Sequence, residues 1–272
     1  MGANGAGGHR AAAAAALTSG MPVWELGPAQ MMVVGTFGDL DLHHHPAVQV
    51  GVGLTGPLTV RTDDVPSRSG YVVVIASGAG HAVWSEPTDL MLALYLAPHS
   101  WPGAALHALS LSESRAGIWF PSGGQQLARA VELALDAGPE TAAARLVDSL
   151  CGAPEEQPGL HPQLRQAMDL IYSGTNDSVD LASVAHEVAV SPDYLGRLCR
   201  QQTGVSFSAA TRWARLISGL KHLADGEQIT DAAHLAGFAD GSHANRVCRE
   251  MTGAAPSEIA RALRNSTDPS KQ

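Results

Sequence analysis

The sequence has no long apolar run, no set of paired cysteines and no excess of basic residues. Its longest apolar runs, at 71–76 and 90–97, are much shorter than the roughly 20 residues that a membrane-spanning helix needs. Three cysteines in unlike contexts do not form a disulfide framework and indicate a reducing compartment. We therefore expect a cytoplasmic protein that does not enter a membrane.

The 272 residues leave room for two domains, and their charge is unevenly divided. The formal net charge is −9, and residues 1–159 hold 6 Lys and Arg against 14 Asp and Glu. Residues 160–264 hold 10 against 11, so the acidity belongs to the N-terminal half. Residues 1–20, with a poly-Ala run and one arginine, are predicted to be a disordered tail, with a signal peptide as the alternative.

A short phrase near the C-terminus occurs twice, at 197–204 and again at 246–253. Each copy follows an apolar segment, 181–188 or 229–236, and a break typical of a tight turn. A repeat of this period indicates a duplicated supersecondary unit, and helix, turn and second helix are the elements of a helix-turn-helix.

Local signals mark the ends of the second helix in each unit. Ser191 is a good N-cap, Pro192 suits the first helical position, and Gly204 suits a left-handed C-cap. In the second unit the helix is predicted from Ser242 to Thr252, closed by Gly253. A long helix at about 207–224 is predicted to join the two units and to fix the distance between them.

These residues resemble the C-terminal DNA-binding domain of the AraC/XylS family of transcription regulators, over roughly 161–264. The matching segments are 190–198, 229–233, 236–238, 242–243, 246–247 and 253–257. Cys199 and Cys248 stand where the family usually has Phe, and Ala244 replaces a larger apolar residue. We expect these departures to loosen the local core.

The resemblance implies which residues read DNA. The family's base-contacting positions correspond to Asp193, Gly196, Arg197, Gly241, Ser242, Asn245 and Arg246. Arg197 and Arg246 are the best candidates because arginine pairs bidentately with guanine. Arg200 and Arg249 are expected to hold phosphates, which position the protein without specifying sequence. A solvated surface role is the alternative for each arginine.

Residues 22–98 are predicted to be β, because short apolar or alternating runs are separated by Gly and Pro. The expected strands are 31–34, 47–54, 58–62, 71–75 and 90–96. His43, His45 and Gln49 share parity, so on one extended strand they project from one face. His81 follows the 71–75 strand after a glycine-containing turn.

The spacing of these four residues resembles the two motifs of the cupin fold, whose metal-binding members use these positions as ligands. Gln49 departs from the pattern, since glutamate usually stands there. Three imidazoles and an amide suit a divalent transition metal such as Zn, Fe, Ni or Cu. Many cupin sensing domains instead hold an organic effector without metal, and that alternative stays open. Trp84 and Trp101 are expected either to line the pocket or to belong to the core.

Residues 101–159 turn helical, with helices predicted at 125–136 and 140–150. In the family such helices commonly form a dimer interface, and packing on their own domain is the alternative. Residues 153–162 are expected to be a linker.

The predicted fold is α+β: a cupin-like β-barrel, a helical dimerisation segment and an all-α domain with two helix-turn-helix motifs. The expected divisions are a tail at 1–20, an effector-sensing barrel at 21–105, a helical segment and linker at 106–159, a DNA-binding domain at 160–265, and a tail at 266–272.

We expect a homodimeric, non-enzymatic transcription regulator that binds double-stranded promoter DNA under control of a small-molecule or metal effector, with RNA polymerase as a further partner. Two rivals are a metal-dependent cupin enzyme with an appended DNA-binding domain, and a protein whose helical repeats bind other proteins. Turnover by the N-terminal domain would favour the first, and the absence of salt-sensitive binding to specific DNA would favour the second.

Overall fold

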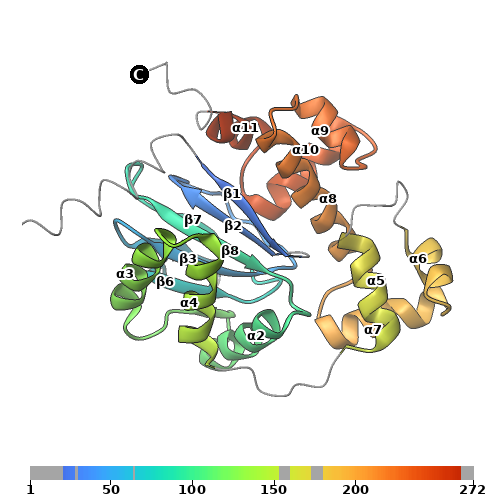
Figure 1. Ribbon diagram of the computed structural model, residues 1–272, viewed down its shortest axis with the longest axis horizontal. Coiled ribbons are helices and arrows are strands. Elements are labelled where there is room, and N and C mark those ends of the chain that lie inside the picture. Colours follow the sequence, from blue (N-terminus) through green and yellow to red (C-terminus); the bar gives the residue numbers. More distant parts are fainter. Residues whose placement is uncertain (1–20, 28–29, 64, 153–159, 173–179, 265–272) are drawn as a thin grey trace, which may run out of the picture.

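A six-stranded antiparallel sheet organises the N-terminal half (Figure 1). The computed structural model describes residues 21–27, 30–63, 65–152, 160–172 and 180–264. The sheet has the order β1-β2-β8-β3-β6-β9, and a second sheet has the order β5-β4-β7. The strand bounds are β1 Val23–Gly27, β2 Gln30–Gly35, β3 Val48–Gly53, β4 Leu58–Arg61, β5 Arg68–Gly70, β6 Val72–Ile75, β7 Ala82–Trp84, β8 Met91–Leu96 and β9 Ile118–Trp119. The predicted barrel therefore takes the form of two sheets rather than one closed ladder.

The two faces of the large sheet are covered by different parts of the chain, because side chains alternate along a strand. One face, with Met32 and Val50, packs against α2 (Trp101–Glu113), α3 (Gly124–Leu135) and α4 (Pro139–Cys151). On the other face, Val73 and Ile75 pack against the second sheet. Residues 106–159 were expected to be a helical segment and linker, and they also contain β9, which pairs with β6.

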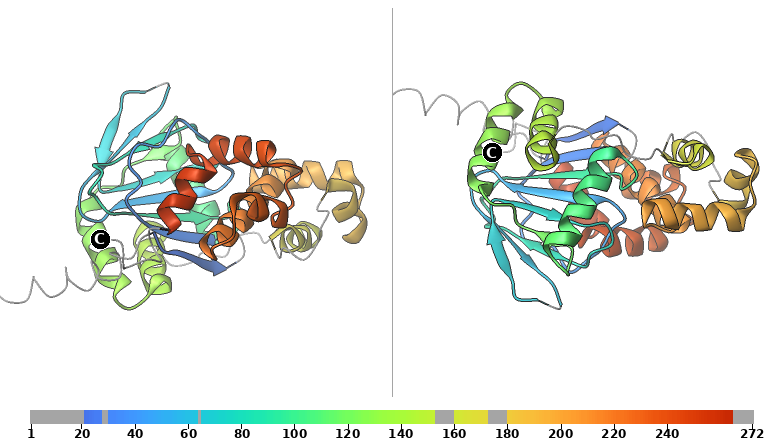
Figure 2. Two further views of the ribbon diagram at one scale, coloured as in Figure 1. Left: turned by 90° about the horizontal axis from the view of Figure 1, so that it is seen from above. Right: turned by 90° about the horizontal axis from the view of Figure 1, so that it is seen from below.

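The rest of that second face is covered by the C-terminal half. Met31 and Val33 of β2 share one hydrophobic core with residues of α8 (Phe207–Ala224), α10 (Gly241–Thr252) and α11 (Pro256–Arg264). Figure 2 shows these orange and red helices on one side of the strands and the green α2–α4 on the other. The two halves are therefore in direct contact.

The C-terminal half contains two helical cores joined by α8. The first surrounds α5 (Pro162–Tyr172), α6 (Leu181–Glu187) and α7 (Pro192–Thr203). The second surrounds α9 (Ile229–Leu235) and α10, and it is the one that extends onto the sheet. The apolar stripe of α5 is buried, and α8 has the predicted bounds.

No helix in the described part of the chain is long and apolar enough to cross a membrane. The expected tails at 1–20 and 266–272 and most of the expected linker lie outside the described residues.

Candidate functional site

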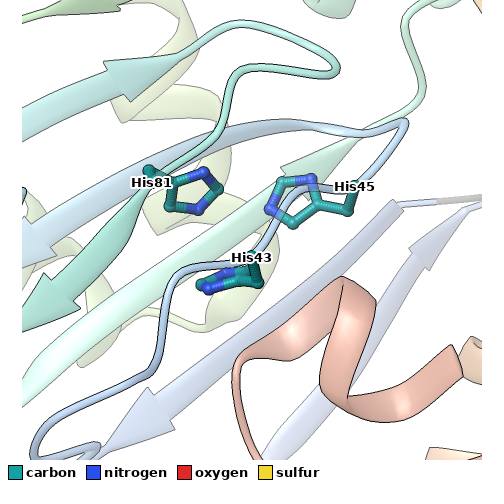
Figure 3. A group of neighbouring side chains, drawn as sticks. All are labelled: His43, His45 and His81. Carbon is teal, nitrogen blue, oxygen red and sulfur yellow. The ribbon is translucent and has the colours of Figure 1, made fainter. Parts of the chain in front are cut away.

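Three histidine side chains converge between the two sheets and the C-terminal half (Figure 3). His43, His45 and His81 are 3%, 1% and 0% exposed, and one ring nitrogen from each lies within 4.8 Å of the others. Gln49, at 1% exposure, lies beside them on β3. The structure thus brings together the four polar residues that the sequence singled out.

The backbone achieves this convergence by a route that the sequence argument did not foresee. The prediction from the sequence assumed one continuous strand from His43 to Gln49. In the structure β3 begins only at Val48, after a bend at 46–47. His43 instead forms an isolated antiparallel bridge with His81, with both N–H···O bonds at 2.9 Å. That bridge places the first and last histidines side by side.

Each imidazole is oriented by its own backbone two residues away. The Nδ1 atoms of His43, His45 and His81 lie 2.7, 3.0 and 2.8 Å from the carbonyl oxygens of Asp41, Ala47 and Ala79. A neutral ring that donates its Nδ1–H to a carbonyl keeps a lone pair on Nε2. Metal-binding histidines are usually fixed by such a bond.

Gln49 completes the site by placing its side-chain oxygen against the Nε2 atoms of two of the imidazoles. Its Oε1 lies 2.9 Å from Nε2 of His45 and 3.0 Å from Nε2 of His81. Each of these rings therefore faces an oxygen on both nitrogens, while a neutral imidazole carries only one N–H. Either the carboxamide turns its NH₂ toward the rings, or a cation lies between the Nε2 lone pairs and Oε1.

Burial keeps these rings neutral, which is the form that binds a metal ion. Desolvation is the largest cause that lowers the pKa of His43 and His81, and it lowers the pKa of His45 to about 4. The neighbouring imidazoles add a smaller effect in the same direction at His45 and His81. Doubly protonated rings are therefore disfavoured here at neutral pH.

The donor set fits a divalent transition-metal ion. Three imidazole nitrogens and one amide oxygen give four ligand atoms, and imidazole suits Zn, Cu, Fe and Ni. His44 is not part of this set: its side chain is 57% exposed and its Nε2 lies 3.8 Å from Glu250 Oε1.

The aromatic rings beside the site are not the tryptophans that the sequence suggested. Tyr95 and Trp213 lie 5.3 and 5.2 Å from the His45 ring, centroid to centroid, rather than Trp84 or Trp101. Trp213 belongs to α8, which was expected only to join the two helix-turn-helix units. No signal in the sequence connects α8 with His45, because the contact crosses between domains.

The second candidate surface is formed by α7, whose caps are the predicted ones, and α10, whose C-cap is the predicted one. Ser191 Oγ accepts from Tyr194 N at 3.2 Å, and Gly204 closes α7 with φ 70°. In the second unit α10 begins at Gly241, one residue before the predicted start; Asp240 caps it by accepting from His243 N at 2.7 Å, and Gly253 closes it with φ 72°. Only glycine adopts this left-handed backbone without strain.

The nine positions expected to face DNA lie on these two helices. Gly196 is half-buried, and the other eight are exposed: Asp193, Arg197, Arg200, Gly241, Ser242, Asn245, Arg246 and Arg249. Their side chains are therefore free to meet a ligand surface, which is what a recognition helix requires.

The departures at Cys199, Cys248 and Ala244 have visible consequences. The two thiols occupy equivalent buried places, with Sγ 3.2 Å from Val205 O and 3.4 Å from Ala254 O respectively. In the second unit a cavity of about 180 Å³ is lined by Ala244 and Cys248, among other residues. The expected loosening of the core by these residues stays a prediction.

Two capped helix-turn-helix units on one connecting helix, attached to a β-rich domain with an enclosed polar site, define a two-domain tandem helix-turn-helix protein. Residues 184–262 match the family model described as a helix-turn-helix domain. The arabinose operon regulatory protein of Escherichia coli is 38% identical over 107 residues, which cover 37% of this chain and 36% of that protein. Its counterpart from Salmonella typhimurium is 37% identical over 107 residues, covering 37% and 38%. Residues 184–262 therefore form a helix-turn-helix domain, and the C-terminal part of the chain is similar to that of the arabinose operon regulatory proteins.

The likeness in fold extends to the N-terminal half. An apo lysine-to-alanine variant of ToxT from Vibrio cholerae aligns with a TM-score of 0.59 and 13% identity, covering 88% of this chain and 100% of that one. ToxT bound to an unsaturated fatty acid aligns with a TM-score of 0.51 and 13% identity, covering 90% and 99%. At this identity the comparison shows a shared fold. The chain spans little more than a third of the length of the curated relatives it matches.

Proposed function

We propose that the protein is a sequence-specific, DNA-binding transcription regulator whose N-terminal domain holds a divalent transition-metal ion as its effector. The observation that carries the effector is the set of three buried, neutral imidazoles, whose Nδ1 atoms all lie against main-chain carbonyls. The DNA-binding part is supported by two exposed, capped helices in a region that matches the helix-turn-helix family model.

The helices α7 and α10 would make different contacts with DNA. Arg197 and Arg246 occupy equivalent positions, and each would pair bidentately with guanine in the major groove. Asn245 would read adenine, while its counterpart Gly196 has no side chain, so α10 reads more bases than α7. Arg200 and Arg249, one turn further along, would hold phosphates. Asp193, Gly241 and Ser242 complete the predicted base-facing set.

His43, His45 and His81 would supply three nitrogen ligands through Nε2, and Gln49 Oε1 the fourth. A site closed on all sides by four protein ligands stabilises a fold and reports ion concentration, whereas a catalytic site keeps a position open for substrate. We therefore propose that this ion is a signal rather than a reagent, and that the protein is not an enzyme. The curated relatives it matches are regulators.

An organic effector is the alternative for this domain, as in ToxT bound to an unsaturated fatty acid. The cavity beside Tyr95 and Trp213 measures about 70 Å³, far below the roughly 300–1,000 Å³ of pockets for drug-sized ligands. A larger cleft, of about 520 Å³, lies between residues 35–41 and α11. At the site formed by the three histidines, the ligand atoms favour a metal ion over an organic effector.

The remaining parts of the proposal follow from the family. The N-terminal domain at 21–105 would be cupin-like, the segment at 106–159 would form the homodimer through α3 and α4, and the domain at 160–265 would bind promoter DNA in the cytoplasm. RNA polymerase would be a further partner.

Two measurements test the proposal separately. Binding of the full-length protein to genomic DNA fragments identifies its sites, and a shift that weakens steeply with salt and favours particular sequences supports DNA binding. Elemental analysis of protein purified without a His-tag or chelator then tests the ion. We expect about one equivalent per chain, lost in His81→Ala and kept in His44→Ala.

A further inference from the structure

The second helix-turn-helix unit contains an apolar cavity of about 180 Å³ between α8, α9 and α10. Leu220 of α8, Ile229 of α9 and Ala244 of α10 are among its lining residues. None of the described residues around it carries a charge. Such walls hold water poorly, because a buried water molecule needs about two to four polar partners. The cavity is therefore suited to an apolar occupant.

Two of the lining positions carry smaller side chains than their counterparts in the first unit. Ala244 stands on α10 where α7 has Leu195. Ala232 and Val184 occupy the same position in α9 and α6, counted from the N-caps of these helices. All four residues are buried. The cavity thus lies where the second unit lacks side-chain volume that the first unit has.

The cavity reaches the surface of the unit beside the proposed recognition residues. Gly241 and Asn245, which belong to the predicted base-facing set, line it and are exposed, as is Ser257 of α11. A small molecule can therefore enter from solvent. The buried Cys248 thiol also lines the cavity, but its Sγ lies 3.4 Å from Ala254 O, so it requires no polar partner from an occupant.

The size and the walls of the cavity select the chemical class of its ligand. Apolar cavities of about 150 Å³ are known to stay dry and to bind benzene or xenon. Phe238 adds an aromatic ring to the wall, and this ring is held by a T-shaped contact with His243, with 5.4 Å between the centroids. A charged ligand would lose its hydration there without finding a partner. Drug-sized ligands occupy pockets of roughly 300–1,000 Å³ and are too large.

We infer that this cavity is a binding site for a small, uncharged aromatic hydrocarbon of about the size of benzene. Empty space destabilises a core in proportion to its volume, and an occupant replaces that space with dispersion contacts to the apolar walls. The site goes beyond the proposed ion-controlled function, because none of its described lining residues belongs to the histidine site. It lies within the region that matches the helix-turn-helix family model.

Amide ¹H–¹⁵N spectra of the full-length protein, recorded during a titration with benzene, test this inference. We expect saturable shifts at Ala232, Gly241 and Asn245, which line the cavity. Val184 and Gly196 hold the positions in the first unit that correspond to Ala232 and Asn245, and their amides should stay unchanged. The absence of saturable shifts at the lining residues, or equal shifts in the two units, would overturn the inference.

Three substitutions show whether benzene occupies this cavity. Ala244→Leu and Ala232→Val introduce the residues of the first unit and fill the space from α10 and from α9, so both should weaken benzene binding. Ala182→Leu adds a leucine at an exposed position on α6 and should bind benzene as the wild type does. Wild-type affinity in Ala244→Leu, or in Ala232→Val where Ala244→Leu does not fold, would place benzene elsewhere and overturn the inference.

Thermal unfolding gives an independent readout of the same site. A ligand that binds only the folded state raises the Tm in proportion to the logarithm of its concentration once it is in excess over Kd. We expect benzene to raise the Tm of the wild type and of Ala182→Leu, and to leave the Tm of Ala244→Leu unchanged. A wild-type Tm that benzene does not raise, at concentrations that saturate the amide shifts, would contradict binding to the folded unit.

Discussion

His43 and His81 exchange backbone hydrogen bonds in both directions, each at 2.9 Å, although they lie in separate parts of the sequence. The bridge holds their imidazole centroids 4.2 Å apart, in a part of the structure where neither ring can reach water. Two neutral rings at this distance contribute little attraction by themselves. Their arrangement fits the ion that we propose on the Nε2 side of the rings.

The recognition residues can be tested by a pair of arginine substitutions on α10. Arg246→Ala should cost about 1–3 kcal/mol at the preferred DNA site and relax discrimination at one or two base pairs. Arg249→Ala should weaken binding to all sequences and reduce the salt slope by about one. Titrations on specific and unrelated duplexes at several salt concentrations distinguish the two effects.

Arg68 on β5 is exposed and lies outside both α10 and the proposed dimer helices, so Arg68→Ala serves as the charge control. If Arg246→Ala and Arg249→Ala leave binding as strong as the control does, α10 is not a recognition helix.

Stability of the metal-free protein should fall in mild acid. The folded state lowers the pKa of His43, His45 and His81 below the ordinary 6.5, chiefly by burial, so the unfolded chain binds more protons. Unfolding is therefore increasingly favoured as pH drops from about 6.5 toward about 4, where His45 alone contributes about 3 kcal/mol. Denaturant unfolding at a series of pH values measures this loss.

His45→Gln removes one of these titrating groups and should flatten the pH profile between those limits. An unchanged slope would mean that His45 is not buried as a neutral ring. Because the folded rings resist protonation, the ion should also persist below pH 6, where unperturbed histidines would begin to release it.

The cavity in the second helix-turn-helix unit predicts that the protein is stabilised by introducing there the larger residue that the first unit has at the equivalent position. Ala244 and Leu195 occupy equivalent positions on α10 and α7, and both are buried. Ala244→Leu should extend into the cavity of about 180 Å³ and raise the free energy of unfolding by about 0.5–2 kcal/mol. The converse, Leu195→Ala, should lower it by about 2–5 kcal/mol.

Thermal unfolding of the two variants, each of which keeps Cys248, measures both changes in stability. A loss of stability in Ala244→Leu would show that the space beside Cys248 does not accept a leucine side chain in a relaxed rotamer.

The two helix-turn-helix units could be predicted closely because their signals are local. Ser191, Pro192 and Gly204 each act within one turn of the chain, so the ends of α7 follow from the sequence. The four polar residues of the candidate ion site were foreseen from their types and spacing, but the assumed continuous strand was wrong, because the chain bends at 46–47, where Pro46 has no N–H to give to a strand ladder.

The packing of α10 against the loop that carries His43 and His45 could not be predicted at all. It joins Asp41 to Gly253 and His45 to Trp213, pairs that are far apart in the chain and carry no shared pattern. The C-cap alone explains why residue 253 is glycine. The sequence therefore does not indicate that Gly253 also contacts the N-terminal domain.

The most direct test of the central claim is the affinity of the full-length protein for its own promoter site, measured with Zn²⁺ and with chelator, for wild type and His81→Ala. We expect wild-type affinity to change at least 5-fold between the two conditions, and His81→Ala to behave as the chelated protein in both. Wild-type binding that is specific but identical with and without the ion would contradict ion control through the three histidines.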